Sequence, residues 1–199
     1  MDVFENIRDK VLSLFNPNGW VKWIHEGTMS AYTHEDRGAN IDYASKSNHC
    51  AKCLNMNDCF FPKNNMPEYP LHYGCHCRIE PVTNITFNAE CSNKKFQNYI
   101  FDPVKNNGKK ALFEKYGYYI KDSQWLQEEL CRQAQEKYAK GYFVLNKLDD
   151  YGQRINIEIT LPNKNGNGSI VFMSGWMVCP NGTITNATPC RGEINERVQ

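Results

Sequence analysis

The most regular pattern in the chain is an alternation of apolar and polar residues over positions 154–161. The apolar positions are Ile155, Ile157, Ile159 and Leu161, and the polar positions are Arg154, Asn156, Glu158 and Thr160. A period of two predicts a strand with one buried and one exposed face. Further apolar runs at 142–148, 169–179 and 183–188, separated by Asn- and Gly-containing turns, predict three more strands. Together they predict a four-stranded antiparallel sheet.

A helical period precedes these strands. Residues Leu126, Leu130, Ala134 and Tyr138 are spaced four apart, which predicts a helix from Asp122–Ser123 to Lys140 with Gly141 as its C-terminal cap. A shorter helix is expected over 108–118 and an amphipathic helix over 2–15. Helices followed by a run of strands indicate an α+β fold, with the helices packed on the sheet.

The composition changes between residues 82 and 95. All five histidines lie before residue 77, and five of the nine cysteines lie between Cys50 and Cys77. Residues 1–90 hold 8 basic and 11 acidic residues (8 − 11 = −3), whereas 91–199 hold 15 and 11 (15 − 11 = +4). We therefore expect two domains, a helical segment with a small Cys/His module over 1–85 and an α+β domain over 92–191.

No segment has the length and apolar character of a membrane span. The longest uncharged stretch, 165–190, is interrupted by Asn, Gly, Ser and Thr. The first fifteen residues carry acids where a signal peptide needs bases. We expect a cytoplasmic protein with no signal peptide and no membrane partner. The odd number of cysteines then favours a metal site over a disulfide framework.

The cysteines and histidines of the N-terminal module have the spacing of metal ligands. Cys50 and Cys53 are separated by two residues, Cys75 and Cys77 by one, and 21 residues lie between Cys53 and Cys75. Two close pairs joined by a loop supply the four ligands of tetrahedral zinc. The loop is rich in Pro and Asn, so a metal would stabilise it where apolar burial cannot. The sequence predicts one zinc ion, held by these four thiolates.

Other ligand sets remain open. His72 can replace Cys75 or Cys77, and Cys59 is within reach. His49 and His76 are expected to lie around the site or at the surface. His25 and His34 are interpreted as ordinary surface or packing histidines. Buried cysteines without a metal are the alternative, although their polar neighbours favour the zinc site.

Two resemblances follow from these features. The segment from about Trp20 to Val82 resembles the cysteine-rich module of phage Mu F-type minor head (head-morphogenesis) proteins, on the residues His49-Cys50-x2-Cys53 and Pro70-Leu71-His72-x2-Cys75-His76-Cys77. That family often ends in His-Pro-x-Cys-Arg-Cys, whose Pro and Arg are absent here. Such modules also occur fused to prophage and polymorphic toxin domains, which implies a bacterial or phage context.

The C-terminal part, 96–189, resembles a small uncharacterised toxin-associated domain. The features that carry the resemblance are Gly108-Lys109-Lys110-Ala111-x-Phe113, Tyr116-Gly117-Tyr118, Trp125-Leu126, Trp176 and Ala187-Thr188-Pro189. The order of helices and strands is similar to the barnase/EndoU/colicin/RelE ribonuclease architecture. The resemblance implies a ribonuclease-like toxin, with RNA as substrate and an immunity protein as partner.

Catalysis in this part has to proceed without histidine, because the last one is His76. The candidate catalytic residues are Arg154, Glu158, Lys110 and Thr188, with Lys109 and Arg191 adding charge. Each also has a plain interpretation as a solvated or strand-capping residue. A non-enzymatic phage-encoded protein that binds a host or virion partner, as an assembly or anti-defence factor, is therefore the alternative function.

Overall fold

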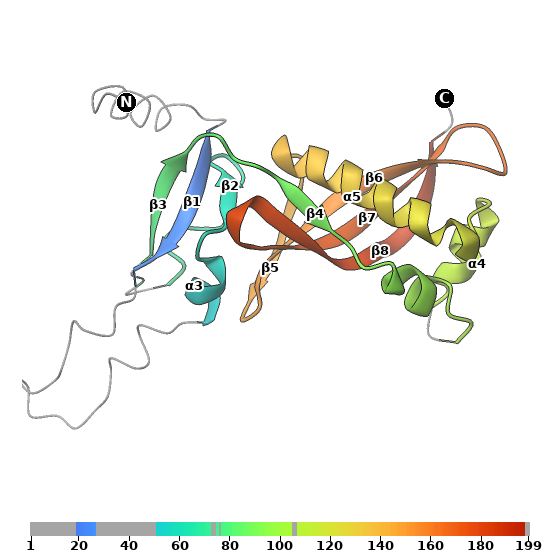
Figure 1. Ribbon diagram of the computed structural model, residues 1–199, viewed down its shortest axis with the longest axis horizontal. Coiled ribbons are helices and arrows are strands. Elements are labelled where there is room, and N and C mark those ends of the chain that lie inside the picture. Colours follow the sequence, from blue (N-terminus) through green and yellow to red (C-terminus); the bar gives the residue numbers. More distant parts are fainter. Residues whose placement is uncertain (1–18, 27–50, 73–74, 76, 105–106, 198–199) are drawn as a thin grey trace, which may run out of the picture. The chain divides into compact units, whose positions relative to one another are not determined.

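The computed structural model describes residues 19–26, 51–72, 75, 77–104 and 107–197. The chain divides into two compact units, shown together in Figure 1. The first contains the residues up to Thr86 together with Lys147–Gln153 and Val178–Gly182, and the second contains the rest. The helix expected over 2–15 lies outside the described residues.

The first unit is built on a three-stranded antiparallel sheet that the hydrophobic pattern does not reveal. Its strand order is β2 (Phe60–Pro62), β1 (Trp20–His25), β3 (Cys77–Val82). The register places His25 opposite Cys77. A short helix, α3 (Ala51–Met56), completes the described part. Its core is small and consists mainly of Val21, Trp23, Met56 and Phe61, with Cys53, Cys59 and Cys77.

The second unit contains a five-stranded sheet, which has the four predicted strands and one additional strand that is parallel to its neighbour. The order is β4 (Asn88–Glu90), β8 (Thr183–Arg197), β7 (Ser169–Val178), β6 (Gly152–Pro162), β5 (Val144–Asp149). Strands β6 and β7 are antiparallel, but β4 pairs with β8 in parallel. β4 is only three residues long and pairs with a strand distant in sequence, so no local alternation reveals it.

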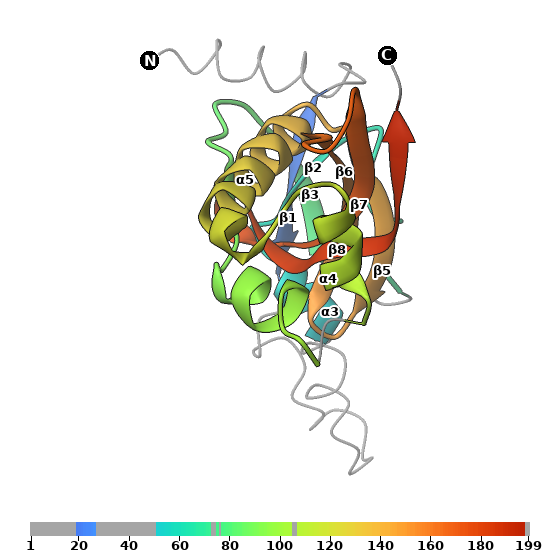
Figure 2. The same cartoon turned by 90° about the vertical axis from the view of Figure 1, so that its right-hand side faces the viewer.

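The helices are α4 (Lys109–Lys115) and α5 (Ser123–Ala139), with a π-turn at Phe96–Ile100 and a 3-10 turn at Ile120–Asp122. Figures 1 and 2 show α5 lying along the sheet. The predicted apolar stripe of α5 is fully buried, as are the four predicted apolar positions of β6. Phe113 of α4 makes an edge-on contact with Phe172 of β7, which the register pairs with Ile159. The α+β class is confirmed.

Gly141 ends α5 as its sequence position predicts. Its φ of +72° lies in the left-handed region that favours glycine, and its N–H donates to the carbonyl of Tyr138 at 2.8 Å. At the other end, Asp122 occupies the N-cap position, but its side chain makes no cap hydrogen bond to α5. It accepts instead from the Tyr119 N–H at 2.8 Å and the Lys164 ammonium at 2.9 Å.

Candidate functional site

Three thiols of the first unit converge on one point. The Sγ atoms of Cys53, Cys75 and Cys77 all lie within 4.8 Å of one another, and the Cys53–Cys75 separation is 3.8 Å. Zinc–sulfur bonds of about 2.3 Å in a tetrahedron put two sulfurs about 3.8 Å apart. The three predicted ligands are thus arranged so that they can hold a metal ion.

Each thiol comes from a different local structure. Cys53 lies in α3, Cys77 is the first residue of β3, and Cys75 lies in the segment just before that strand. The Tyr69 hydroxyl donates to the Cys77 carbonyl at 2.8 Å and so helps to fix the start of β3. The site therefore depends on the β1–β3 pairing and on the position of α3, and not on the Cys spacing alone.

Two histidines lie at ligand distance from this cluster. The His72 Nε2 is 3.1 Å from Cys53 Sγ, and the His25 Nδ1 is 3.7 Å from Cys77 Sγ. In a tetrahedral site a coordinated nitrogen and sulfur are about 3.6 Å apart, from bonds of about 2.0–2.1 Å and about 2.3 Å. Neither imidazole lies within 4.8 Å of all three sulfurs, so each contacts the cluster on one side. The sequence pattern does not indicate His25 as a ligand, because only the strand register brings it opposite Cys77.

Cys50, the remaining predicted thiolate ligand, lies outside the described residues, as do His34, His49 and His76. The alternative ligand Cys59 is directed elsewhere. It is fully buried, and its thiol donates to the carbonyls of Asn55 at 3.4 Å and Val178 at 3.8 Å.

The electrostatics of the cluster favour a bound cation. Burial, and then the neighbouring Cys77 thiol, raise the pKa of Cys53 far above its usual value, and burial also raises the pKa of Cys77. Three adjacent thiolates repel one another unless positive charge is placed among them. Among the described residues, the buried Trp23 indole N–H has no hydrogen-bond partner other than the Cys77 sulfur, and this contact partly offsets the rise in the pKa of Cys77 that burial causes.

The predicted catalytic residues lie on three elements, which are β6, α4 and β8. Arg154 and Glu158 lie with Asn156 and Thr160 on the half-buried face of β6, opposite the buried isoleucines. Lys110 lies on α4, where its ammonium is 3.9 Å from the Glu114 carboxylate. The structure therefore gathers part of the predicted set on one face of the sheet.

The long strand β8 brings further groups to this face. The Arg191 Nη1 donates to Asn156 Oδ1 at 3.3 Å, and the Arg197 Nη2 donates to Glu158 Oε2 at 2.9 Å. A Cβ added at Gly175 would lie 3.7 Å from the Thr188 Cβ and 3.9 Å from Asn156 Oδ1, so Thr188 is on the same face. The expected strand over 183–188 ends before Arg197, so the sequence pattern gave no reason to place Arg197 on this face.

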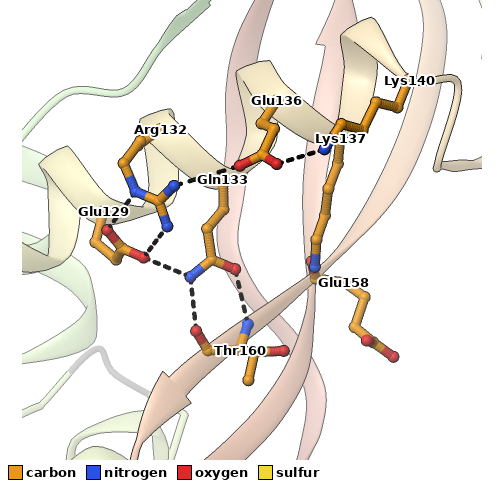
Figure 3. Close-up of polar contacts among 8 residues, drawn as sticks. All are labelled: Glu129, Arg132, Gln133, Glu136, Lys137, Lys140, Glu158 and Thr160. Carbon is orange, nitrogen blue, oxygen red and sulfur yellow. Dashed lines mark hydrogen bonds and ion pairs between the residues drawn. The ribbon is translucent and has the colours of Figure 1, made fainter.

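Two α5 side chains contact the backbone of β6 at Glu158 and Thr160 (Figure 3). The Gln133 amide donates to the Thr160 carbonyl at 2.6 Å and accepts from the Thr160 N–H at 3.0 Å. The Lys137 ammonium donates to the Glu158 carbonyl at 2.6 Å, and partial burial lowers its pKa. These contacts satisfy backbone groups of β6 and fix the position of Glu158.

Within the described part of the chain, no helix is long and apolar enough to cross a membrane. No curated protein and no solved structure matches the chain. A family model described as a domain of unknown function, DUF6883, matches residues 83–188, which include the π-turn, both helices and most of the five-stranded sheet. Because this match covers more than half of the sequence, the chain belongs to the DUF6883 family.

Proposed function

We propose that the protein is an effector of the prophage or polymorphic-toxin kind, whose second unit cleaves RNA without a metal and whose first unit is stabilised by a structural zinc ion. The observation that carries the proposal is the polar face of β6. Arg154, Arg191 and Arg197 lie there with the carboxylate of Glu158 and the hydroxyl of Thr188. Three arginines can bind the negatively charged oxygens of a phosphate ester, and one carboxylate can accept the proton of the attacking hydroxyl.

The proposed reaction is attack of the RNA 2′-hydroxyl on the adjacent phosphorus. Glu158 takes the hydroxyl proton while the new 2′-O–P bond forms. The P–O5′ bond breaks, and solvent protonates the leaving 5′ oxygen. The arginines stabilise the charge on the non-bridging oxygens, and Arg197 orients the Glu158 carboxylate through their 2.9 Å contact.

Zinc is the metal that we propose for the first unit. Its ligands would be Cys53, Cys75 and Cys77 with His72, His25 or Cys50 as the fourth. Sulfur-rich tetrahedral sites favour zinc over magnesium or calcium. A closed set of four protein ligands leaves no position for water, so the ion stabilises the fold and takes no part in RNA cleavage.

The test is RNA cleavage by purified protein, with and without a chelator, and growth of a host cell that expresses it. We expect Glu158→Gln and Arg154→Ala each to lower the cleavage rate about 100-fold or more, because each removes a contact made in the transition state. The matched control is Glu136→Gln, an exposed helical carboxylate paired with Lys140. Wild-type protein that neither cleaves RNA nor harms the cell contradicts the enzyme proposal.

A non-enzymatic phage-encoded binding protein is the second candidate. The specific observation in its favour is that no histidine follows His76, so the second unit lacks the side chain that most readily moves protons near neutral pH. This candidate predicts a stable complex with a host or virion protein, and it predicts that Glu158→Gln leaves that complex intact.

A further inference from the structure

The polar face of β6 carries a side-chain amide whose orientation its neighbours fix. Asn156 lies on this face between Arg154 and Glu158. Its Oδ1 accepts hydrogen bonds from the Arg191 Nη1 at 3.3 Å and from the Asn146 Nδ2 at 3.4 Å. A guanidinium carries N–H donors and no acceptor, so the amide atom that faces Arg191 has to be the oxygen. The amide nitrogen of Asn156 is therefore held on the other side.

This amide nitrogen is left as a donor for a ligand. Among the residues that the structure describes, the Asn156 Nδ2 makes no hydrogen bond, whereas both lone pairs of its Oδ1 are engaged. Asn156 is half-buried, so part of its side chain is open to solvent. The Asn156 amide thus offers N–H groups and no acceptor to whatever binds this face.

The neighbouring strand β7 places no side chain opposite the amide. The residue paired with Asn156 is Gly175, whose φ is not in the left-handed region. A Cβ there would make only ordinary contacts, at 3.7 Å to the Thr188 Cβ and 3.9 Å to Asn156 Oδ1, so crowding does not require a glycine either. Glycine inside a strand weakens it, and its usual reason is a bulge, a bend or the close approach of a ligand. Since Gly175 is itself buried, a ligand here would rest on the Asn156 and Thr188 side chains.

We propose that Asn156 recognises the base of the RNA substrate and selects the keto bases, guanine and uracil. The inference rests on the RNA cleavage proposed above and names its substrate as unpaired RNA that is cut after G or U. Guanine presents a carbonyl oxygen at O6 and uracil one at O4, and both accept from an N–H donor. Adenine and cytosine carry amino donors at the same positions, N6 and N4, so donor would face donor at Asn156.

The spacing along β6 suits recognition of the nucleotide that is cleaved. Residues two apart on one face of a strand have Cα atoms about 7 Å apart, which is the spacing of Asn156 and Glu158. One nucleotide can therefore place its 2′-hydroxyl at Glu158 and its base edge at Asn156, and the P–O5′ bond on the 3′ side of that base breaks. Duplex RNA pairs this edge or hides it in the deep groove, so the substrate is single-stranded. Asn156 contacts the base and moves no proton.

The test uses the full chain and oligodeoxynucleotides that each contain one ribonucleotide, so that only one 2′-hydroxyl is available. We expect kcat/KM to be about 10-fold or more higher for guanosine than for adenosine, and for uridine than for cytidine, because the amino bases lose the hydrogen bond and oppose two donors. Inosine, which keeps O6, should be cut like guanosine. 2-Aminopurine riboside, which lacks O6, should be cut like adenosine.

Asn156→Asp should reverse the preference. The carboxylate keeps an oxygen for Arg191 and puts an acceptor where the N–H donors were, so adenosine and cytidine should become the better substrates. The preference is a ratio within one variant, so a general loss of rate does not obscure it. The matched control is Asn98→Asp, which makes the same change of charge on an exposed residue of the π-turn. It should keep the wild-type order of the four bases.

The outcomes separate this inference from the proposed function. Equal cleavage at all four ribonucleotides, a wild-type preference for adenosine and cytidine, or an unchanged order in Asn156→Asp would overturn base recognition by Asn156 and leave the proposed RNA cleavage in place. No cleavage at any single ribonucleotide also overturns it, and if natural RNA is uncut as well, the proposed function fails with it. If circular dichroism shows that Asn156→Asp does not fold, the inosine and 2-aminopurine substrates decide, because they test the same oxygen with the wild-type protein.

Discussion

The two units reach stability by different routes. The first has few large buried side chains around β1, and three of its buried residues are cysteines. The second buries the apolar faces of α5, β6 and β7 together with several aromatic rings. Since each square ångström of buried apolar surface contributes about 25 cal/mol, a small core leaves little to offset chain entropy. We therefore expect the first unit to depend on a metal held by its cysteines, whereas the second depends on apolar packing.

Removal of the metal should give the largest difference between the units. We expect a chelator, or Cys53→Ser, to abolish amide-exchange protection in β1 and β3 and to leave β6 and β7 protected. Structural zinc contributes about 10–16 kcal/mol in small zinc modules, which exceeds what the small core can replace. Metal analysis should fall from one equivalent to near zero.

Cys59→Ala is the matched control for the metal site, because Cys59 is buried but donates to backbone carbonyls. It should retain one equivalent of metal. If the amides of residues 20–25 stay protected from exchange after complete metal removal, the small core alone stabilises the first unit. The expected dependence of that unit on metal would then be wrong.

A core truncation in the second unit should have the opposite effect. Ile157→Ala removes a fully buried side chain from β6 and should lower the free energy of unfolding by about 2–5 kcal/mol. Denaturant titration followed by the α5 helical signal measures this change. The metal content should stay at one equivalent, and a loss of metal would show that the units do not stabilise independently.

The contact between Gln133 and β6 should have an intermediate effect. Gln133→Ala leaves the N–H and carbonyl of Thr160 without their partner, which should cost about 1–3 kcal/mol. Gln135→Ala, an exposed position on the same helix, should change stability by less than about 0.5 kcal/mol. If the two variants lower the free energy of unfolding equally, Gln133 does not stabilise the domain through its contacts with Thr160.

The smallest expected effect is the pH dependence of the Asp122–Lys164 pair. Although burial opposes it, hydrogen bonds from Lys164 and the Tyr119 N–H lower the pKa of Asp122 below 3.8. When the pKa of a carboxyl group is lower in the folded than in the unfolded protein, its ionisation stabilises the folded state at pH values above the unfolded pKa. This stabilisation is lost as the pH falls through the folded pKa. We expect Asp122→Asn to cost about 1 kcal/mol near pH 7 and less below pH 3.8. A constant difference across that range would contradict the assignment.

The sequence predicted the second unit better than the first. The four-residue period of α5 and the two-residue period of β6 are local signals, and both faces are buried as expected. β1 and β3 lack a clean alternation, and their sheet is built from segments far apart in the sequence. The predicted domains, 1–85 and 92–191, stay a prediction, which separate expression of the two fragments would test.

The candidate sites show the same contrast. The Cys-x2-Cys and Cys-x-Cys spacings indicated thiolate ligands, and Cys53, Cys75 and Cys77 do converge. The contact of His25 with Cys77 could not be predicted from the sequence, because strand register decides which residues face each other. In the same way Arg191 and Arg197 reach β6 only through the length of β8.

By itself the sequence determined the α+β class, the buried faces of α5 and β6, and three cysteines that can hold a metal together, because these depend on residue type and short-range period. Only the tertiary structure decided the parallel β4–β8 pairing and the approach of His25 and His72 to the thiols. Such contacts join residues that are distant along the chain. Chain folding brings them together, and no local pattern records which distant residues will meet.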